Sequence, residues 1–195
     1  GSGDMKIKKM PAHKSCFHGK RSRKSIKYIV IHYTGNSNDT AANNGKYFRR
    51  EQSGSRWGVG AHFFVGKKGV IVRSIPMNRI AWSVGGLVTQ NNGAGTYYNM
   101  CTNQNSVSIE LCSATKGYTD KQAEAVKWLI TQYIQKRCPN AKVIIRHWDV
   151  NGKNCPAPMV GKDNKAWKEF KRKIQDDFKG FVKNCRKIFS ESPTN

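Results

Sequence analysis

Runs of apolar residues bounded by polar turns predict several strands along the chain. Residues 27–34 (KYIVIHYT) and 142–147 (KVIIRH) are nearly unbroken apolar runs rich in β-branched residues. This pattern is typical of strands that are buried on both faces. Residues 61–75 contain two further apolar runs joined by Gly-Lys-Lys-Gly, which predicts a hairpin.

A third predicted strand covers residues 106–112 (SVSIELC), where polar and apolar residues alternate. Because successive side chains of a strand point to opposite faces, Val107, Ile109 and Leu111 face one way, and Ser108 and Glu110 face the other. This strand therefore presents an acidic side chain on its polar face.

Helical patterns separate these strands. Asp39 is expected to cap a short helix that runs to about Gln52, and Thr119 with Gln122 forms a capping box for a longer helix. A third helix is expected from about Asn164. Apolar residues three or four positions apart give the last two helices their buried stripes: Val126, Ile130, Tyr133 and Ile134 in one, and Trp167, Phe170, Ile174, Phe178, Phe181 and Cys185 in the other.

Alternating strands and helices predict an α/β fold, with a central mixed β-sheet flanked by helices. The 195 residues fit a single domain, and 37% of them are hydrophobic, which suffices for a core. We expect three parts. Residues 1–24 comprise an expression scar (residues 1–4) followed by a basic lead-in. The folded domain covers residues 25–172, and a basic amphipathic tail helix covers residues 173–195. The tail is expected to pack its apolar residues on the domain; binding of its end to a membrane or wall is the alternative.

Charge is the strongest compositional feature. Thirty-five Lys and Arg residues against twelve Asp and Glu give a net charge of +23, which favours polyanionic partners such as nucleic acid, an anionic membrane or a phosphate-rich cell wall. No apolar run approaches the roughly 20 residues that span a membrane. No signal peptide is recognisable, so synthesis in the cytoplasm is expected. The six cysteines form no regular framework and are expected to be mostly reduced, in a monomeric protein.

The residues able to carry chemistry lie at the ends of the predicted strands. His32, Glu110 and His147 each come near the carboxyl end of a different strand, and ligands of open α/β sheets bind outside those ends. Cys155 follows His147 across a loop that Pro156 stiffens, so the thiol can return to the same strand end.

Two imidazoles and one thiolate predict a zinc site with a fourth position open to water. Such an ion activates water and polarises a carbonyl group. Glu110 is the expected general base, and Lys153 is expected to stabilise an oxyanion. Each residue taken alone has a simpler interpretation, as a structural histidine, a buried thiol or a surface charge. Only their joint arrangement favours a metal-dependent hydrolase.

The motifs YIVIHYTGN, GVGAHFFVGKKGVIVRSIP, AWSVGG, NSVSIELC and RHWDVNGKNCPAP occur in this order between about Ser25 and Phe170. In this respect the chain resembles the zinc-dependent N-acetylmuramoyl-L-alanine amidases of type 2, which include phage endolysins, bacterial autolysins and peptidoglycan recognition proteins. The resemblance implies hydrolysis of the amide between muramic acid and L-alanine. It also implies zinc on His32, His147 and Cys155, with Glu110 as base and Lys153 at the oxyanion.

Two positions depart from the pattern of this family. Ala61 stands where some members carry a tyrosine, which places more weight on Glu110. Ser83 stands where many members carry a histidine that contacts substrate (AWHAG), so that histidine contact is absent from this loop. His62 is expected to have a structural role rather than to bind the metal.

Three classes of function remain. The enzyme is preferred, because the resemblance implies that non-catalytic relatives lack the cysteine ligand. A peptidoglycan-binding module without catalysis is the alternative. A nucleic-acid-binding protein ranks last, because no recognition motif for nucleic acid is present. We expect action on the cell wall, after release through a phage pore or export by another route, with anionic wall polymers as further partners. An endolysin is favoured over an autolysin.

Overall fold

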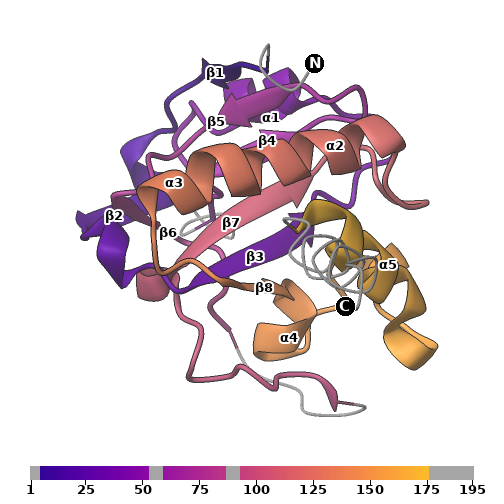
Figure 1. Cartoon of the computed structure of the whole chain (residues 1–195). Helices are drawn as coiled ribbons and strands as arrows, with labels where there is room; N and C mark the ends of the chain where they lie inside the picture. Colours follow the sequence, from indigo (N-terminus) through magenta and orange to yellow (C-terminus); the bar gives the residue numbers. More distant parts are fainter. Residues whose placement is uncertain (1–4, 53–58, 87–92, 176–195) are drawn as a thin grey trace, which may run out of the picture.

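A six-stranded mixed sheet forms the centre of the molecule in the computed structural model, which describes residues 5–52, 59–86 and 93–175. Neighbouring strands run parallel except β4 and β5, which form the predicted antiparallel hairpin (Figure 1). The expected α/β fold is therefore confirmed. The strands, in their order across the sheet, are β1 (Ile7–Lys9), β5 (Ile71–Arg73), β4 (Phe63–Val65), β7 (Ser106–Leu111), β3 (Tyr28–Tyr33) and β8 (Val143–Arg146).

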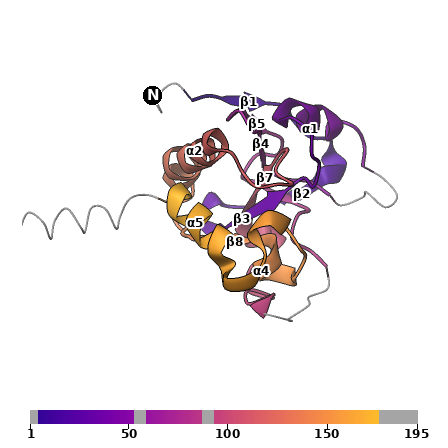
Figure 2. The ribbon, with the colours of Figure 1, turned by 90° about the vertical axis from the view of Figure 1, so that its right-hand side faces the viewer.

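Helices cover both faces of this sheet. Figure 2 shows α2 and α5 on one side of the strands and α1 on the other. A continuous helix covers residues 120–137, with a π-helical turn in its middle. The helices are α1 (Ala41–Tyr47), α2 (Asp120–Trp128), η7 (Leu129–Ile134, the π-helical turn), α3 (Gln135–Arg137), α4 (His147–Asn151) and α5 (Lys165–Ile174).

Alternation along the central strands separates an apolar face from a chemically active one. Val107, Ile109 and Leu111 of β7 are fully buried in the main core, under α2 and α5. Ser108 and Glu110 lie on the opposite face of the same strand, as predicted. His32 lies beside Glu110 in the parallel pairing of β3 with β7. The main core thus supports the strands from behind, and the polar side chains project from the other side.

The basic lead-in contributes to the folded structure. β1 extends the central sheet, and β2 (Phe17–Lys20) pairs with β6 (Arg79–Ala81) in a second, two-stranded sheet. Arg21 donates hydrogen bonds to the carbonyl oxygens of Met77, Asn103 and Gln104 at 2.9, 3.1 and 3.0 Å, and burial lowers its pKa to about 10. Residues 5–24 are therefore packed on the domain, although the proposed boundary at residue 24 stays a prediction.

Both boundaries of α1 differ from the sequence-based expectation. Thr40, not Asp39, caps α1, because the Thr40 side chain accepts the amide of Asn43, whereas the Asp39 carboxylate accepts the amide of Ser113 at 2.6 Å. That helix ends at Tyr47, ahead of Gln52. By contrast, the helix expected from about Asn164 is confirmed, since Asn164 is the N-cap of α5.

Other expectations for the helices are confirmed. The capping box of Thr119 and Gln122 is present at the start of α2. Trp167 and Phe170 of α5 are buried in the main core, as expected, and so is Ile174. The role of the tail beyond Ile174 stays a prediction. Phe178, Phe181 and Cys185 lie outside the described residues. Within the described part of the chain, no helix is long and apolar enough to cross a membrane.

Candidate metal centre

His32 lies near the carboxyl end of β3, a strand paired on both sides. In the parallel register His32 is opposite Glu110 of β7, and its side chain is only 2% exposed. The apolar residues Ile29 and Ile31 alternate with it and anchor the strand in the core. The position of His32 is therefore set by sheet pairing on one face and by core packing on the other.

His147 directly follows β8 and is the first residue of α4, rather than the last residue of the strand as the sequence suggested. The junction is held by Arg146 and Asp149: the Arg146 amide donates to Asp149 Oδ2 at 2.7 Å, and its guanidinium lies 2.9 Å from Asp149 Oδ1. Gly152, with φ of 81°, ends α4 in the left-handed conformation that glycine favours. This short helix turns the His147 ring back over the sheet.

Cys155 follows α4 and returns to the end of β3, as its spacing from His147 predicted. Its Sγ accepts a hydrogen bond from the Tyr33 amide at 3.5 Å, and its carbonyl accepts one from the Trp148 amide at 3.0 Å. The residue is 3% exposed. The loop is therefore tied both to the neighbouring strand and to α4.

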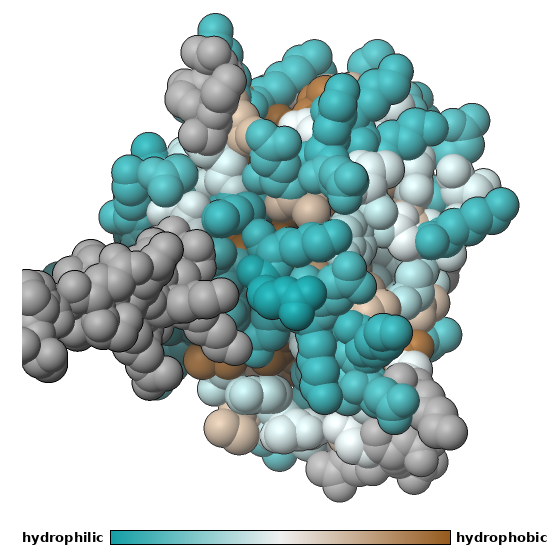
Figure 3. All heavy atoms as spheres, turned by 45° about the vertical axis from the view of Figure 1, so that its right-hand side comes forward, coloured by the Kyte–Doolittle hydropathy of each residue, from teal (hydrophilic) through white to brown (hydrophobic). Residues whose placement is uncertain are grey.

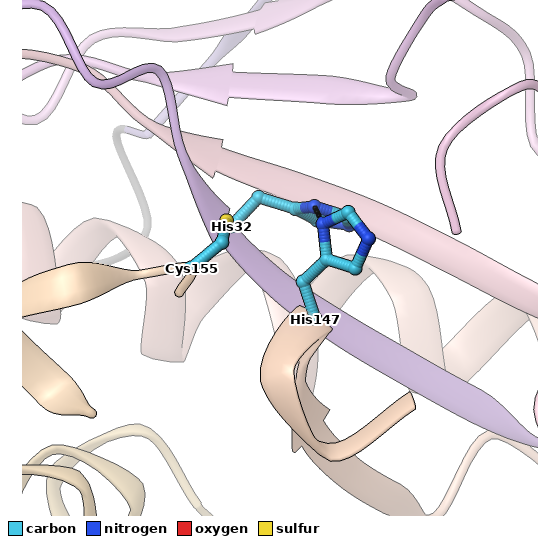
Figure 4. Close-up of side chains that lie close together, drawn as sticks. All are labelled: His32, His147 and Cys155. Carbon is cyan, nitrogen blue, oxygen red and sulfur yellow. Dashed lines mark hydrogen bonds between the residues drawn. The ribbon is translucent and has the colours of Figure 1, made fainter. Parts of the chain in front are cut away.

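The three side chains meet although they come from three segments of the chain (Figure 4). The Nδ1 atoms of His32 and His147 lie 3.0 Å apart. All three potential ligand atoms, including the Cys155 Sγ, lie within 4.8 Å of one another. Two nitrogens bound about 2.0–2.1 Å from a tetrahedral zinc ion are separated by roughly 3.3 Å, close to the spacing found here. The donor set and its spacing thus fit a metal ion.

The protonation of the ligands also fits a metal site. Burial lowers the pKa of His147 to about 4, with a further contribution from Lys153, and burial likewise lowers the pKa of His32. Both imidazoles are therefore neutral at pH 7, the form that binds metals. Burial raises the pKa of Cys155 to about 12, so its thiol must lose a proton when a metal binds.

Both histidines have partners for the ring nitrogen that faces away from the centre. Ser108 Oγ lies 3.1 Å from His32 Nε2, and Asn151 Nδ2 lies 2.9 Å from His147 Nε2. Sequence reasoning missed both partners. Asn151 lies four positions after His147, a spacing that places two side chains on the same face of a helix, so it could have been found.

Glu110 and Lys153 lie beside the three ligands. The Glu110 side chain is 20% exposed, and its Oε1 is 3.7 Å from His32 Nδ1. Burial raises the pKa of Glu110 to about 8, while the positive charge of Lys153 opposes this shift. Desolvation therefore favours the protonated form of Glu110, whereas the neighbouring Lys153 favours the ionised form.

A groove runs over this centre. One part, of about 360 Å³, is lined by the three ligands together with Trp82, Ser83 and Asn151. An adjoining part, of about 480 Å³, extends along α1 past Asn43 and Tyr47. Residues shared by both parts include Tyr33, Gly60, Glu110 and Lys153. An extended substrate therefore has room on both sides of the centre.

Ala61, Ser83 and His62 lie in different surroundings. Ala61 lines the groove along α1. Ser83 lines the groove over the ligands, and its Oγ accepts a hydrogen bond from Ser108 at 2.7 Å. His62 is fully buried away from the ligands; its Nδ1 accepts the Ser108 amide at 3.1 Å and its Nε2 lies 2.9 Å from the Arg79 carbonyl. These contacts agree with the structural role expected for His62.

Solved structures share this fold. The structure of PlyL superposes with a TM-score of 0.66 at 22% identity, covering 88% of this chain and 98% of that one. A mutant endolysin from Bacillus subtilis superposes with a TM-score of 0.62 at 23% identity, covering 87% and 98%. At these identities the likeness concerns the fold.

Sequence comparison adds the family. N-acetylmuramoyl-L-alanine amidase CwlA of Bacillus subtilis (strain 168) is 33% identical over 155 residues, covering 78% of this chain and 50% of CwlA. N-acetylmuramoyl-L-alanine amidase BlyA of the same strain is 28% identical over 176 residues. The match covers 87% of this chain and 46% of BlyA. The chain thus spans about half the length of these relatives. Because the family profile described as N-acetylmuramoyl-L-alanine amidase matches residues 22–158, this chain belongs to that family.

Proposed function

We propose that this chain is a zinc-dependent peptidoglycan hydrolase, which cleaves the amide between N-acetylmuramic acid and the L-alanine of the stem peptide. The observation that carries the proposal is the convergence of His32, His147 and Cys155 under a groove that also contains Glu110 and Lys153. Membership of the amidase family supports the choice of bond. CwlA and BlyA carry the name of the same activity.

Zinc is the proposed ion, held by His32, His147 and Cys155. Three protein ligands of imidazole and thiolate type are typical of catalytic zinc, which keeps a position open, whereas structural zinc is usually closed by a fourth ligand. When bound, zinc supplies Lewis-acid polarisation of the carbonyl and lowers the pKa of water.

Glu110 and Lys153 carry out the remaining tasks in this proposal. Glu110 accepts a proton from the attacking water and delivers it to the nitrogen of the leaving L-alanine, because an acid with a pKa raised to about 8 can both gain and lose a proton near neutral pH. Lys153 places a positive charge in the same groove, where negative charge develops on the carbonyl oxygen during attack.

Digestion of purified peptidoglycan with the zinc-loaded protein tests the reaction. New L-alanine amino groups, without new reducing sugar ends, are the expected products. New reducing ends would identify a glycosidase instead. Binding without either product would favour the alternative, a peptidoglycan-binding module without catalysis. The buried thiol of Cys155 among the ligands favours the enzyme.

Anionic wall polymers are the proposed second partner, and an acid-free surface supports this proposal. Two segments without any Asp or Glu, residues 5–38 and 125–148, meet at the end of the sheet where β3 and β8 begin. Asn140 Nδ2 donates to the Lys24 carbonyl at 2.8 Å, which joins the two segments. We name this region, at the left of Figure 1, the basic face; its exposed cations are Lys20, Arg23, Lys24, Lys27, Lys136, Arg137 and Lys142.

The surfaces of α2 and α5 carry acidic as well as basic side chains. α2 carries Asp120 and Glu124 among its lysines, and α5 carries Glu169 among its cations. The face in Figure 3 is mostly hydrophilic. Paired charges cancel at a distance, whereas an acid-free cluster attracts a polyanion. The basic face lies at the opposite strand ends from the metal centre, so a polymer bound there leaves the groove open.

Neutralising the basic face tests its role. Replacing Arg23, Lys24, Lys27 and Lys142 together with Gln is expected to weaken binding to purified walls and to reduce its dependence on salt. The matched control replaces Lys121, Lys165, Lys168 and Lys171 with Gln, which removes the same charge from α2 and α5. Equal losses in both variants would contradict a localised site. Equal binding of the protein to walls stripped of anionic polymer would also contradict it, and tighter binding to DNA would favour the nucleic-acid alternative.

A further inference from the structure

Ser108 occupies a central place behind the metal centre. It is fully buried on β7, two residues before Glu110 and on the same face of the strand. Its Oγ lies 3.1 Å from His32 Nε2, and it donates a hydrogen bond to Ser83 Oγ at 2.7 Å. The hydroxyl therefore links a metal ligand to a residue of the groove wall.

The hydrogen bonds from His32 through Ser108 to Ser83 can all form at once. A neutral imidazole carries one proton, so an Nδ1 that binds a metal requires the proton on Nε2. The Nε2–H of His32 can then donate to Ser108 Oγ. A hydroxyl group both donates and accepts, so Ser108 Oγ can accept from His32 Nε2 while it donates to Ser83 Oγ. The Ser108–Ser83 contact is thus compatible with the tautomer that a metal needs.

Both serines are held in position by their backbones. The Ser108 amide donates to His62 Nδ1 at 3.1 Å, and His62 Nε2 lies 2.9 Å from the Arg79 carbonyl and 3.1 Å from the Arg21 guanidinium. The Ser83 amide donates to Asn103 Oδ1 at 3.1 Å. Both serine amides are thus hydrogen-bonded to side chains from other parts of the chain.

We propose that Ser108, supported by Ser83, is a positioning residue that holds the His32 ring in the orientation and tautomer that present Nδ1 to a metal ion. Outer partners of metal-binding histidines are usually carboxylates, carbonyls or water. Here a pair of hydroxyl groups takes that role. Ser83 stands where the family resemblance places a histidine. In this chain its hydroxyl therefore supports Ser108.

Zinc affinity measures this role directly. Competition with a chromophoric chelator is expected to show about 10–100-fold weaker zinc binding for Ser108→Ala than for the unaltered protein. The matched control is Ser106→Ala: Ser106 is equally buried on the same strand, but its hydroxyl donates to the Thr102 carbonyl at 2.7 Å, away from the ligands. The control should bind zinc with unchanged affinity. Cobalt substitution gives a second readout, because the visible spectrum reports a displaced ligand.

Ser83→Ala should weaken binding less than Ser108→Ala, since His32 keeps its direct partner. The double variant should bind zinc no more weakly than Ser108→Ala alone, because the two hydroxyls act in series. Unchanged zinc affinity in Ser108→Ala would overturn the proposal. If circular dichroism shows that Ser108→Ala is unfolded, Ser83→Ala decides: weaker binding supports the relay, and unchanged binding overturns it.

This inference rests on the proposed zinc site but not on the proposed substrate. A protein that binds zinc tightly, loses affinity on Ser108→Ala and leaves peptidoglycan intact would refute the proposed reaction and support the role of Ser108. If the protein cleaves peptidoglycan and Ser108→Ala keeps full zinc affinity, the proposed reaction is supported and the role of Ser108 is refuted. The two proposals can therefore fail separately.

Discussion

The Nδ1 atoms of His32 and His147 lie 3.0 Å apart, although 115 positions separate the two residues in the chain. Their approach follows from the parallel pairing of β3 with β8, in which Ile31 is opposite Arg146. The next residue after each of these is a histidine, His32 in β3 and His147 at the start of α4, so the two lie at the same end of the sheet. Because one residue of slippage would turn a side chain to the other face, the register of this pair decides whether the centre forms.

Replacement of Cys155 by Ser should remove most of the stabilisation that zinc provides. A ligand at a thousandfold excess over its dissociation constant adds about 4 kcal/mol to the free energy of unfolding. We expect thermal denaturation with and without zinc to show a large shift for the unaltered protein and little for Cys155→Ser. Cys138→Ala is the control, because Cys138 is buried in the main core and should leave the shift intact. An equal shift in both variants would place the ion elsewhere.

Glu110→Gln should abolish catalysis and spare the metal. The amide has nearly the same shape as the carboxylate but cannot accept the proton, so release of L-alanine amino groups should fall by about 10²–10⁴-fold. Zinc affinity measured on the same preparation should stay close to that of the unaltered protein. Glu124→Gln on α2 provides a control for loss of one negative charge. Substantial activity in Glu110→Gln would assign the base role to another group.

Lys153→Met tests the oxyanion role. Methionine keeps most of the length and apolar character of the side chain but has no charge, so kcat should fall by about 10²–10³-fold. Binding of muropeptides should change much less, because the charge acts mainly on the transition state. A raised KM with kcat unchanged would mean that Lys153 binds substrate rather than stabilising the oxyanion.

His62 should make stability depend on pH. Burial lowers its pKa to about 3, compared with 6.5 for a free histidine, so between these pH values the unfolded chain binds a proton that the folded protein does not. The free energy of unfolding should therefore fall as the pH drops from about 6.5, by up to ~1.4 kcal/mol per pH unit from this residue.

The comparison with His62→Asn isolates that contribution. Asparagine can still accept the Ser108 amide but does not titrate in this range. Urea denaturation of the metal-free proteins between pH 6.5 and pH 4 should give a shallower pH dependence for the variant. Parallel curves would mean that His62 is protonated in the folded state.

Sequence alone predicted the core of the site because strand periodicity fixes facing directions. The alternation around Glu110 and the unbroken apolar run before His32 placed both residues at strand ends, and the parallel pairing of β3 and β7 sets them opposite each other. The return of Cys155 to this edge follows from a short loop. Local pattern was enough, since each residue lies at the end of a regular element.

Contacts between distant loops were beyond such reasoning. Nothing local to Ser83 and Ser108 indicates that their hydroxyl groups meet, because that contact depends on Asn103 holding the intervening loop. The sequence places Arg21 in a charged lead-in, yet its guanidinium donates hydrogen bonds to three carbonyl groups far along the chain. Asp39 lost its expected capping role to Thr40 because Ser113, a tertiary neighbour, binds its carboxylate.

Among the residues that the structure describes, β1 forms one edge of the central sheet, and its Lys8 and Lys9 are exposed. An unpaired edge strand is a template onto which a strand of another molecule can add. Two molecules approaching edge to edge would bring like charges from both chains together, in strands only three residues long. The lysines of this segment therefore discourage self-association in concentrated solution, a property that solubility measurements after replacing both with Thr would reveal.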